Sequence, residues 1–372
     1  MSKDAYTAVI VGFAHVHIND VAAHFAASPR IRLSDCADVP PLTPEMRTAP
    51  YTRDWNIDYC AKKFGLKVWE DWRKMLDAVQ PDLCVVNSEN ARHVEIATEC
   101  ARRGIGVCLE KPMSTNFPDA LKMYRAARVN NTLLMINWPV AWRYGFHTAK
   151  KMIDSGAVGN LIEIKTRMGH TGPLGWGLSQ SGVDEKTGAM TGAEKASVWW
   201  YQNAAGGGAM ADYCCYGCLV ARWFAGEQAV AASGMRINSG MPLGDAEDNA
   251  VMVARFTNMY AVIEGSWTTF HHTFKSPIVY GDAGSIVVDY TNGQITLYRA
   301  GETPEEIKGE AAPPNLQTPA AAYIHHMDTG EPLHELLCAE LNLDAHSMLD
   351  AGIRSASSGK VELVNNIKWQ IG

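Results

Sequence analysis

Short runs of apolar residues alternate with amphipathic stretches over the first third of the chain. Unbroken apolar runs are typical of parallel strands that are buried on both faces. The stretches between them have helical spacing: in HVEIATECARRG, Val94, Ala97 and Ala101 fall on one face, and Gly104 supplies a helix end. This alternation predicts a parallel sheet covered by helices. The expected strands are Ala8–Val11, Ile31–Ala37, Leu83–Val86, Gly106–Leu109 and Leu133–Asn137.

One irregular stretch interrupts this pattern. DVPPLTPEMRTAPYTRDWN, residues 38–56, contains four prolines, which are incompatible with a regular helix or strand. We therefore expect a long loop there, and loops of that length are usually functional or mobile.

The pattern changes after about Trp138. A helical stretch around Phe146–Ser155 is followed by segments of alternating polar and apolar residues, such as NAVMVARF and GSIVVDY, with turn residues between them. Period-two alternation indicates a largely antiparallel sheet with one open face. The sequence thus predicts an α/β protein with a doubly wound parallel domain in residues 1–137. An α+β domain with a large, mostly antiparallel open sheet is expected in residues 138–372.

Composition narrows the class of protein. The chain has 372 residues, of which 47% are hydrophobic and 20% charged, as in ordinary globular proteins. A net charge of −7 with scattered basic residues gives no footprint for nucleic acid, and no apolar run is long enough to span a membrane. The amino terminus lacks a cleavable apolar segment, so we expect a cytoplasmic protein whose nine cysteines are buried thiols.

The turn after the first strand, GFAHVH, resembles a dinucleotide-binding loop with two of its three glycines replaced. Gly12 keeps the residue of the tight turn, Ala14 is small enough for close approach to a pyrophosphate, and His17 stands at the third position. Two other interpretations stay open: a pair of surface histidines, or a His-x-His metal site made by His15 and His17. The later strands end in Asn87, Glu110 and Asn137, which we do not expect to complete a metal shell, so no metal is predicted.

The second predicted strand ends near an acidic residue, as expected for a Rossmann domain. Asp38 lies some twenty-odd residues after the turn, where a carboxylate accepts hydrogen bonds from an adenosine ribose. Asp35 is a competing candidate. A carboxylate would repel a 2′-phosphate, and no arginine follows directly, so NAD is favoured over NADP.

The most specific motif is VCLEKPMST, residues 107–115, in which a strand runs directly into Glu110-Lys111-Pro112. With VVNSENARHVEIATECARRG before it and AGGGAMADYCCYG at residues 205–217, the chain resembles the Gfo/Idh/MocA oxidoreductases over nearly its whole length. The resemblance implies a Glu-Lys-Pro motif on the nicotinamide side of the site. It also implies a homodimer or homotetramer formed through the carboxy-terminal sheet. The expected cofactor-binding residues are Gly12, Phe13, Ala14, His15, Val16, Asp38, Ser88, Glu89, Asn90, His93, Glu110 and Lys111.

Three residues are candidates for handling a proton. Oxidation of an alcohol needs a base, and a desolvated lysine beside a cationic nicotinamide is pushed toward its neutral form, which suits Lys111. Asp212 and Tyr216 lie four residues apart, on one face of an expected helix. Most of the family has histidine at the position of Tyr216. Tyr216 could take the proton if a nearby cation lowers its pKa, or it could only bind the substrate.

The expected reaction is the NAD(H)-dependent oxidation of a secondary hydroxyl of a sugar, glycoside or cyclic polyol, or reduction of the matching ketone. The alternatives are a catalytically silent NAD-binding regulator and a His-x-His metal-dependent hydrolase. Aromatic faces stack on sugars, and basic or amide groups bind hydroxyls. The candidate substrate contacts are Trp138, Arg143, His170, Trp199 and Trp200.

Overall fold

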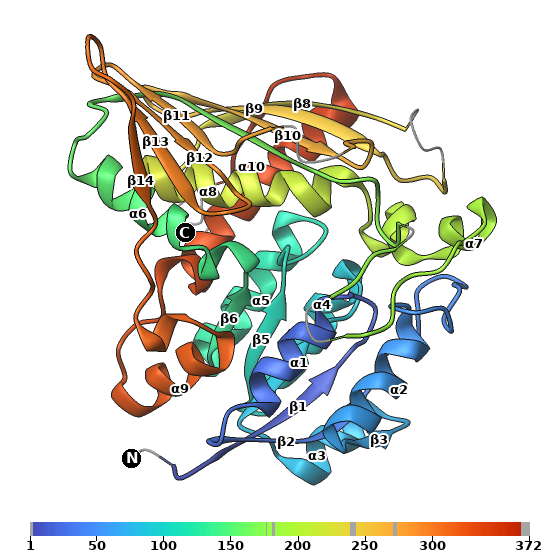
Figure 1. Cartoon of the computed structure of the whole chain (residues 1–372). Coiled ribbons are helices and arrows are strands. Elements are labelled where there is room, and N and C mark those ends of the chain that lie inside the picture. Colours follow the sequence, from blue (N-terminus) through green and yellow to red (C-terminus); the bar gives the residue numbers. More distant parts are fainter. Residues whose placement is uncertain (1–2, 176, 181–182, 239–242, 271–273, 366–372) are drawn as a thin grey trace.

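The computed structural model describes residues 3–175, 177–180, 183–238, 243–270 and 274–365. Its two sheets lie one above the other, with helices between them (Figure 1). The first sheet contains six parallel strands in the order β3-β2-β1-β4-β5-β6. The strand order reverses between β1 and β4, and ligands bind at such a switch point in open α/β sheets. The strands are β1 (Tyr6–Val11), β2 (Ile31–Ala37), β3 (Lys67–Trp69), β4 (Leu83–Val86), β5 (Gly106–Glu110) and β6 (Leu134–Asn137).

Helices alternate with these strands along the chain, as in a doubly wound domain. They are α1 (Ile18–Ala26), α2 (Arg53–Phe64), α3 (Trp72–Val79), α4 (His93–Arg102) and α5 (Phe117–Val129). The expectation of an entirely irregular stretch over residues 38–56 is wrong at its end, because α2 begins at Arg53. The prolines all precede that residue, so none of them interrupts the helix.

The second sheet has nine strands in the order β14-β13-β12-β11-β7-β10-β9-β8-β15, and β7 with β10 is its parallel pair among otherwise antiparallel neighbours. Helix α8 lies beneath this sheet in Figure 1, between it and the first sheet, and α6 and α10 also pack against its strands. The elements are α6 (Tyr144–Asp154), β7 (Leu161–Gly169), α7 (Gly192–Ser197), α8 (Cys215–Ala225), β8 (Ala231–Ile237), β9 (Asn249–Arg255), β10 (Tyr260–Ser266), β11 (Ile278–Gly281), β12 (Ser285–Val288), β13 (Gln294–Tyr298), β14 (Glu305–Lys308), α9 (Pro319–Thr329), α10 (Ala339–Ser358) and β15 (Glu362–Leu363).

The last helices return to the first sheet. The Tyr6 hydroxyl donates to Asp328 on α9 (2.9 Å), and the Phe117 amide donates to Asp350 on α10 (3.1 Å). Residues before and after 138 therefore share one interface, and the domain boundary at 137/138 stays a prediction.

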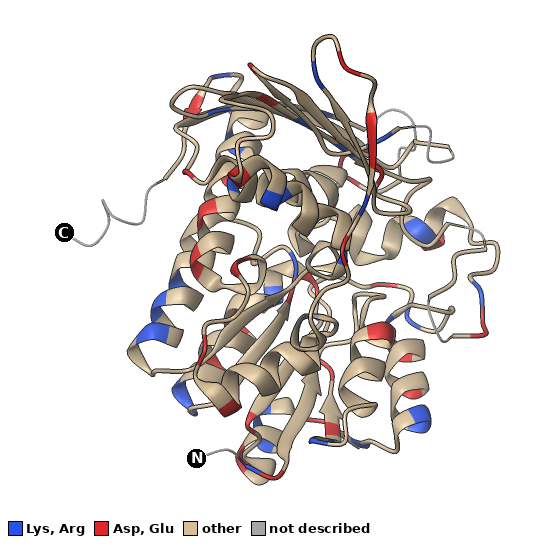
Figure 2. Ribbon diagram, turned by 60° about the vertical axis from the view of Figure 1, so that its left-hand side comes forward, with Lys and Arg blue, Asp and Glu red and all other residues tan. Residues whose placement is uncertain are grey.

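Basic and acidic residues, blue and red in the ribbon of Figure 2, are interspersed along the chain. Within the described ranges, no helix has the length and apolarity needed to cross a lipid bilayer.

Candidate active site

The turn after β1 needs glycine at its first position. Gly12 has φ +91°, and a Cβ atom there would lie 2.5 Å from the backbone nitrogen of Ser88 on the neighbouring strand end. The loop is tied to β4 because the His15 amide donates to the carbonyl of Asn87 (3.1 Å). Close contact between the β1 and β4 ends therefore fixes the path of this loop.

His15 and His17 meet Glu110, which ends β5. The His17 Nδ1 atom lies 2.9 Å from a Glu110 carboxylate oxygen, and His15 Nε2 lies 4.0 Å from the same atom. One ligand atom from each of the three residues falls within 4.8 Å of the others. The parallel strands β1 and β5 thus bring Glu110 to the two histidines, and the expectation that the later strand ends do not complete a metal shell stays a prediction.

The hydrogen bonds of this cluster favour a proton network over a metal site. The His17 amide donates to His15 Nδ1 (3.2 Å), which places the proton of a neutral His15 on Nε2, the atom that faces Glu110. Burial and the nearby cations hold the pKa of His15 well below its usual value, so its ring is neutral. A metal ligand needs that nitrogen unprotonated, and the loop's own hydrogen bond opposes this.

Lys111 and Asp212 form a buried ion pair between the two domains. The Lys111 ammonium donates to the Asp212 carboxylate (2.8 Å) and to its backbone carbonyl (3.1 Å), and only 2% of Lys111 is exposed. The indole N–H of Trp267 donates to the other oxygen of Asp212 (3.1 Å). Lys111 and Trp267 thus hold the Asp212 carboxylate from two sides. Folding brings Lys111 and Asp212 together although they lie 101 positions apart in the sequence.

This pairing sets the charge state of both groups. Burial alone would lower the pKa of Lys111, but Asp212, with Cys215 and Glu110, raises it above the ordinary value. Burial would raise the pKa of Asp212, and the Lys111 charge reverses that direction. Paired with Asp212 in this way, the lysine is an ammonium group, and the expectation that a cationic nicotinamide pushes it toward its neutral form stays a prediction.

Tyr216 presents its ring, not its hydroxyl, to Lys111. The Lys111 nitrogen lies 4.7 Å from the ring centroid, a cation–π contact, and the Trp138 ring meets Tyr216 edge-on at 5.2 Å. Burial raises the pKa of Tyr216 well above its usual value, which is opposite to the direction that a proton acceptor needs. A π-helical turn, Met210–Cys214, carries Asp212, whereas Tyr216 lies on α8, so the two do not share a regular helix.

The side chain of Arg53 occupies the space beside Asp38, just after the end of β2. Its guanidinium donates to Asp38 (3.1 Å), to Glu89 (2.8 Å) and to Glu45, and only 1% of Arg53 is exposed. Arg47 also reaches within 3.9 Å of Asp38. No arginine follows Asp38 directly in the sequence, but the loop after β2 folds back and brings Arg53, the first residue of α2, to this carboxylate.

We expect Arg53→Leu to destabilise the protein by about 3 kcal/mol, at the lower end of the range for breaking a buried ion pair. The substitution leaves Asp38, Glu45 and Glu89 without their counter-ion. Burial already raises the pKa of Asp38 and Glu45, so protonation absorbs part of the loss. Urea unfolding measures the change, with the half-exposed Arg47→Leu as the matched control. Equal unfolding curves for both variants would contradict the role of Arg53.

The other expected cofactor residues are buried at the same sheet edge. His93 holds the ends of β4 and β5 together, with its two ring nitrogens near the carbonyls of Met113 (3.1 Å) and Ser88 (3.2 Å). The Asn90 amide donates to the carbonyl of Gly206 (2.8 Å). Among the described residues, Asp38 Oδ2, Asn90 Oδ1 and Asn137 Oδ1 are buried acceptors without a hydrogen-bond partner.

A cavity of about 740 Å³ opens between the domains, at the carboxyl ends of the first sheet. Of the expected residues, those that line it are His15, Val16, Lys111, Arg143, His170, Trp200, Asp212 and Tyr216. Trp138 does not line it: its indole N–H bonds to Asn342. Trp199 instead donates to the carbonyl of Ala14 (2.8 Å) and covers the loop after β1. Sequence analysis missed other lining residues, including His17, Asn137, Trp142, Tyr213 and Tyr290.

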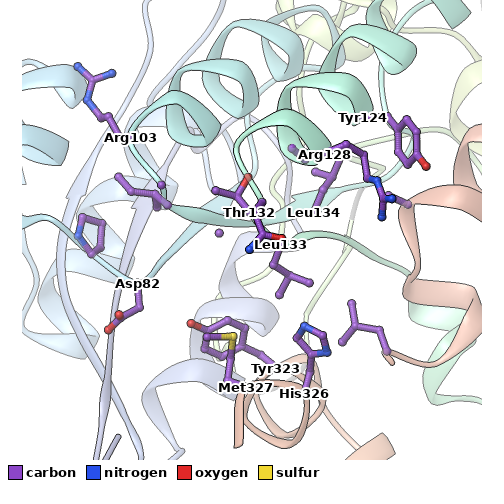
Figure 3. A pocket seen from close by; sticks show the side chains of 18 of the residues that line it. Asp82, Arg103, Tyr124, Arg128, Thr132, Leu133, Leu134, Tyr323, His326 and Met327 are labelled. Carbon is purple, nitrogen blue, oxygen red and sulfur yellow. The ribbon is translucent and has the colours of Figure 1, made fainter. Parts of the chain in front are cut away.

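A second, larger cavity of about 1150 Å³ lies at the opposite edge of the first sheet. Figure 3 shows Arg103, Arg128, Tyr323 and His326 around it. It adjoins the amino ends of β5 and β6, whereas ligands of open α/β sheets bind at the carboxyl ends. We therefore assign the candidate active site to the smaller cavity.

Comparison with known proteins agrees with this geometry. A family model described as an oxidoreductase family with an NAD-binding Rossmann fold matches residues 46–138, and the GFO/IDH/MocA carboxy-terminal domain matches residues 146–287. An uncharacterised oxidoreductase of Streptococcus pneumoniae is 24% identical, over 84% of this chain and 90% of that protein. Levoglucosan dehydrogenase of Pseudarthrobacter phenanthrenivorans is 26% identical, over 62% of this chain and 61%, less than two thirds, of that enzyme.

Among solved structures, aldose-aldose oxidoreductase from Caulobacter crescentus, complexed with glycerol, has the same fold. Its TM-score is 0.76 at 19% identity, over 96% of this chain and 99% of that one. Both domain models belong to one family, and the residues they match include the Glu-Lys-Pro motif and part of each sheet. The chain belongs to the Gfo/Idh/MocA family of oxidoreductases.

Proposed function

We propose that the protein is an NAD(H)-dependent oxidoreductase acting on a secondary hydroxyl of a sugar, glycoside or cyclic polyol, or on the matching ketone. The observation that supports this most directly is the buried pair of Lys111 and Asp212 in the wall of the interdomain cavity. Such a pair holds a mobile proton where a substrate oxygen can reach it. The dehydrogenase named among the relatives acts on a sugar derivative, levoglucosan.

The donor set at the sheet edge suits a dinucleotide. Gly12 supplies the tight turn, and the unpartnered oxygens of Asp38, Asn90 and Asn137 are acceptors of the kind that ribose hydroxyls and a carboxamide use. When bound, NAD supplies the hydride acceptor or donor. The cavity reaches His15, Val16 and Lys111, while Arg53 fills the edge at Asp38. In this proposal the adenosine end of the cofactor displaces Arg53 from Asp38. We propose NAD rather than NADP because the three carboxylates around Arg53, those of Asp38, Glu45 and Glu89, would repel a 2′-phosphate.

Lys111 serves as the proton donor or acceptor in this proposal. As an ammonium group it can protonate the oxygen of a ketone substrate as that carbon is reduced. In the opposite direction it accepts the hydroxyl proton only after it has released its own. Asp212 orients the ammonium and balances its charge, and Trp267 holds Asp212 in place. Tyr216 supports Lys111 through its ring.

We also propose that copies of the chain associate through the open face of the nine-stranded sheet. Large apolar side chains are exposed on alternate positions of its strands, including Met235 (70%), Ile237 (57%) and Val253 (42%). Exposed rows of this kind mark interaction surfaces. A homodimer or homotetramer would cover them, and light scattering would show a mass of two or four chains.

One titration followed by one substrate panel tests the function. NADH fluorescence is titrated with the protein, NADPH serves as the comparison, and sugars, glycosides and polyols are then assayed at the nicotinamide absorbance. We expect NADH to bind more tightly than NADPH and at least one panel member to be turned over. Binding of NADH without turnover would indicate a regulator. A stoichiometric metal with no NADH binding would indicate the His15–His17 hydrolase.

A further inference from the structure

Among the described residues that line the interdomain cavity, one of the two permanent cations is not part of an ion pair. Its fixed cations are Lys111 and Arg143, and its carboxylates are Asp20 and Asp212. Lys111 and Asp212 pair with each other at 2.8 Å, and Asp20 lies 3.7 Å from the ring of His24. Within the described part of the chain, no carboxylate lies within 4.0 Å of the Arg143 guanidinium. Arg143 therefore has no carboxylate counter-ion among the described residues.

Arg143 is held with its hydrogen-bonding edges available. It follows a short 3₁₀ helix, Pro139–Trp142, and precedes α6, and its guanidinium carbon lies 4.9 Å from the centroid of the Tyr290 ring. The Arg143 guanidinium also donates a hydrogen bond to the Tyr290 hydroxyl, and the arginine is exposed, so its remaining N–H groups can bind an anion. Tyr290 comes from the turn after β12, so two separate segments build this contact.

Tyr290 lines the same cavity as Lys111, and its hydroxyl interacts electrostatically with both Lys111 and Arg143. Burial raises the pKa of the Tyr290 hydroxyl, and the charges of Arg143 and Lys111 both act to lower it. The hydroxyl thus lies within electrostatic reach of both cations. Lys111, Tyr290 and Arg143 line the same cavity, so a sugar bound there with one hydroxyl at Lys111 would have Arg143 in the wall of its binding site.

We infer that the substrate carries a carboxylate and that Arg143 binds it, so that the substrate is a sugar acid such as a uronic acid. This inference rests on the proposed function for the identity of the reaction, but not for the binding of the anion. A planar guanidinium matches a carboxylate through two parallel hydrogen bonds. A single uncompensated cation suits a group with one negative charge, whereas a phosphate ester carries nearly two.

Calorimetric binding of matched pairs tests the inference without requiring turnover. D-Glucuronate is compared with D-glucose, and D-galacturonate with D-galactose, in the full-length protein with and without NADH. We expect at least one uronate to bind about tenfold more tightly than its hexose, the minimum for a charge-assisted hydrogen bond. Arg143→Gln should reduce this preference at least about tenfold, and Arg143→Lys should keep part of it, because lysine retains the charge without the fork.

The control variant is Arg299→Gln, which removes an equal charge just after β13, outside the residues that line the cavity. It should keep the preference of the unmodified protein. Equal binding of acids and hexoses, no uronate binding at all, or a preference that survives Arg143→Gln would overturn the inference. So would tighter binding of glucose 6-phosphate than of glucuronate. Uronate binding that depends on Arg143 in a protein that does not bind NADH would instead contradict the proposed function alone.

Discussion

Replacement of Lys111 by methionine is expected to lower kcat/KM by about 10²- to 10⁴-fold, the usual contribution of a positioned acid or base. Methionine keeps much of the length and apolar volume of the side chain but cannot hold a proton. Steady-state assays with a substrate from the panel measure the loss. The affinity for NADH is measured on the same variant, because Lys111 is also an expected cofactor-binding residue, and a loss of kcat at saturating NADH identifies the chemical defect.

The substitution also leaves Asp212 as an uncompensated buried charge, so its effect on folding needs a control. The double variant Lys111→Met/Asp212→Asn removes both charges and should recover thermal stability without recovering activity. Lys150→Met serves as the matched lysine variant, because Lys150 pairs with Asp154 on the surface of α6. Near-normal kcat/KM in a folded Lys111→Met protein would rule out the proposed role.

The free energy of unfolding is expected to fall steeply as the pH drops from about 6.5 toward 4. Burial lowers the pKa of His334 and His346 to about 4, and those of His15 and His93 fall below the usual 6.5. An unfolded chain binds protons on these rings near pH 6.5, while the folded chain does not. Stability is therefore present above pH 6.5 and lost on acidification, by up to about 1.4 kcal/mol per pH unit for each histidine.

Urea unfolding at several pH values between 7.5 and 4.5 measures this slope. Three carboxyl groups oppose it, because burial raises the pKa of Asp38, Glu45 and Glu247 and thereby favours the folded state at low pH. The variant His334→Gln/His346→Gln should show a shallower slope than the unmodified protein. A flat dependence between pH 7 and 5 would show that these rings are not buried as neutral groups.

The first sheet could be read from the sequence because its strands are unbroken apolar runs. The bounds of β2 and β4 agree with the predicted ones, and β5 and β6 differ by one residue at an end. The short edge strand β3 was missed. Its residues Lys67 and Val68 are exposed, so no hydrophobic pattern distinguishes it from a loop.

The sequence could indicate candidate residues of the site, such as Lys111, but not the protonation states and ion pairs of those residues in the folded chain. The Glu-Lys-Pro motif identified Lys111, yet its protonation state depends on Asp212, which tertiary folding alone brings to 2.8 Å. Arg53 follows a proline-rich stretch without periodicity, so its contacts with three carboxylates left no sequence signal. The hydrogen bond from Trp199 to a backbone carbonyl was not predictable either, because the sequence does not show which group an indole N–H faces.

The π-helical turn at Met210–Cys214 has a consequence for the evolution of this site. A turn of this kind accommodates one more residue than a regular helical turn, and each residue advances a helix by about 100°. Deleting one residue there would swing the preceding side chains by that angle relative to α8 and withdraw the Asp212 carboxylate from Lys111. Homologues that differ in length by a single position at this turn should accordingly present another side chain to the lysine, even where every motif letter is retained.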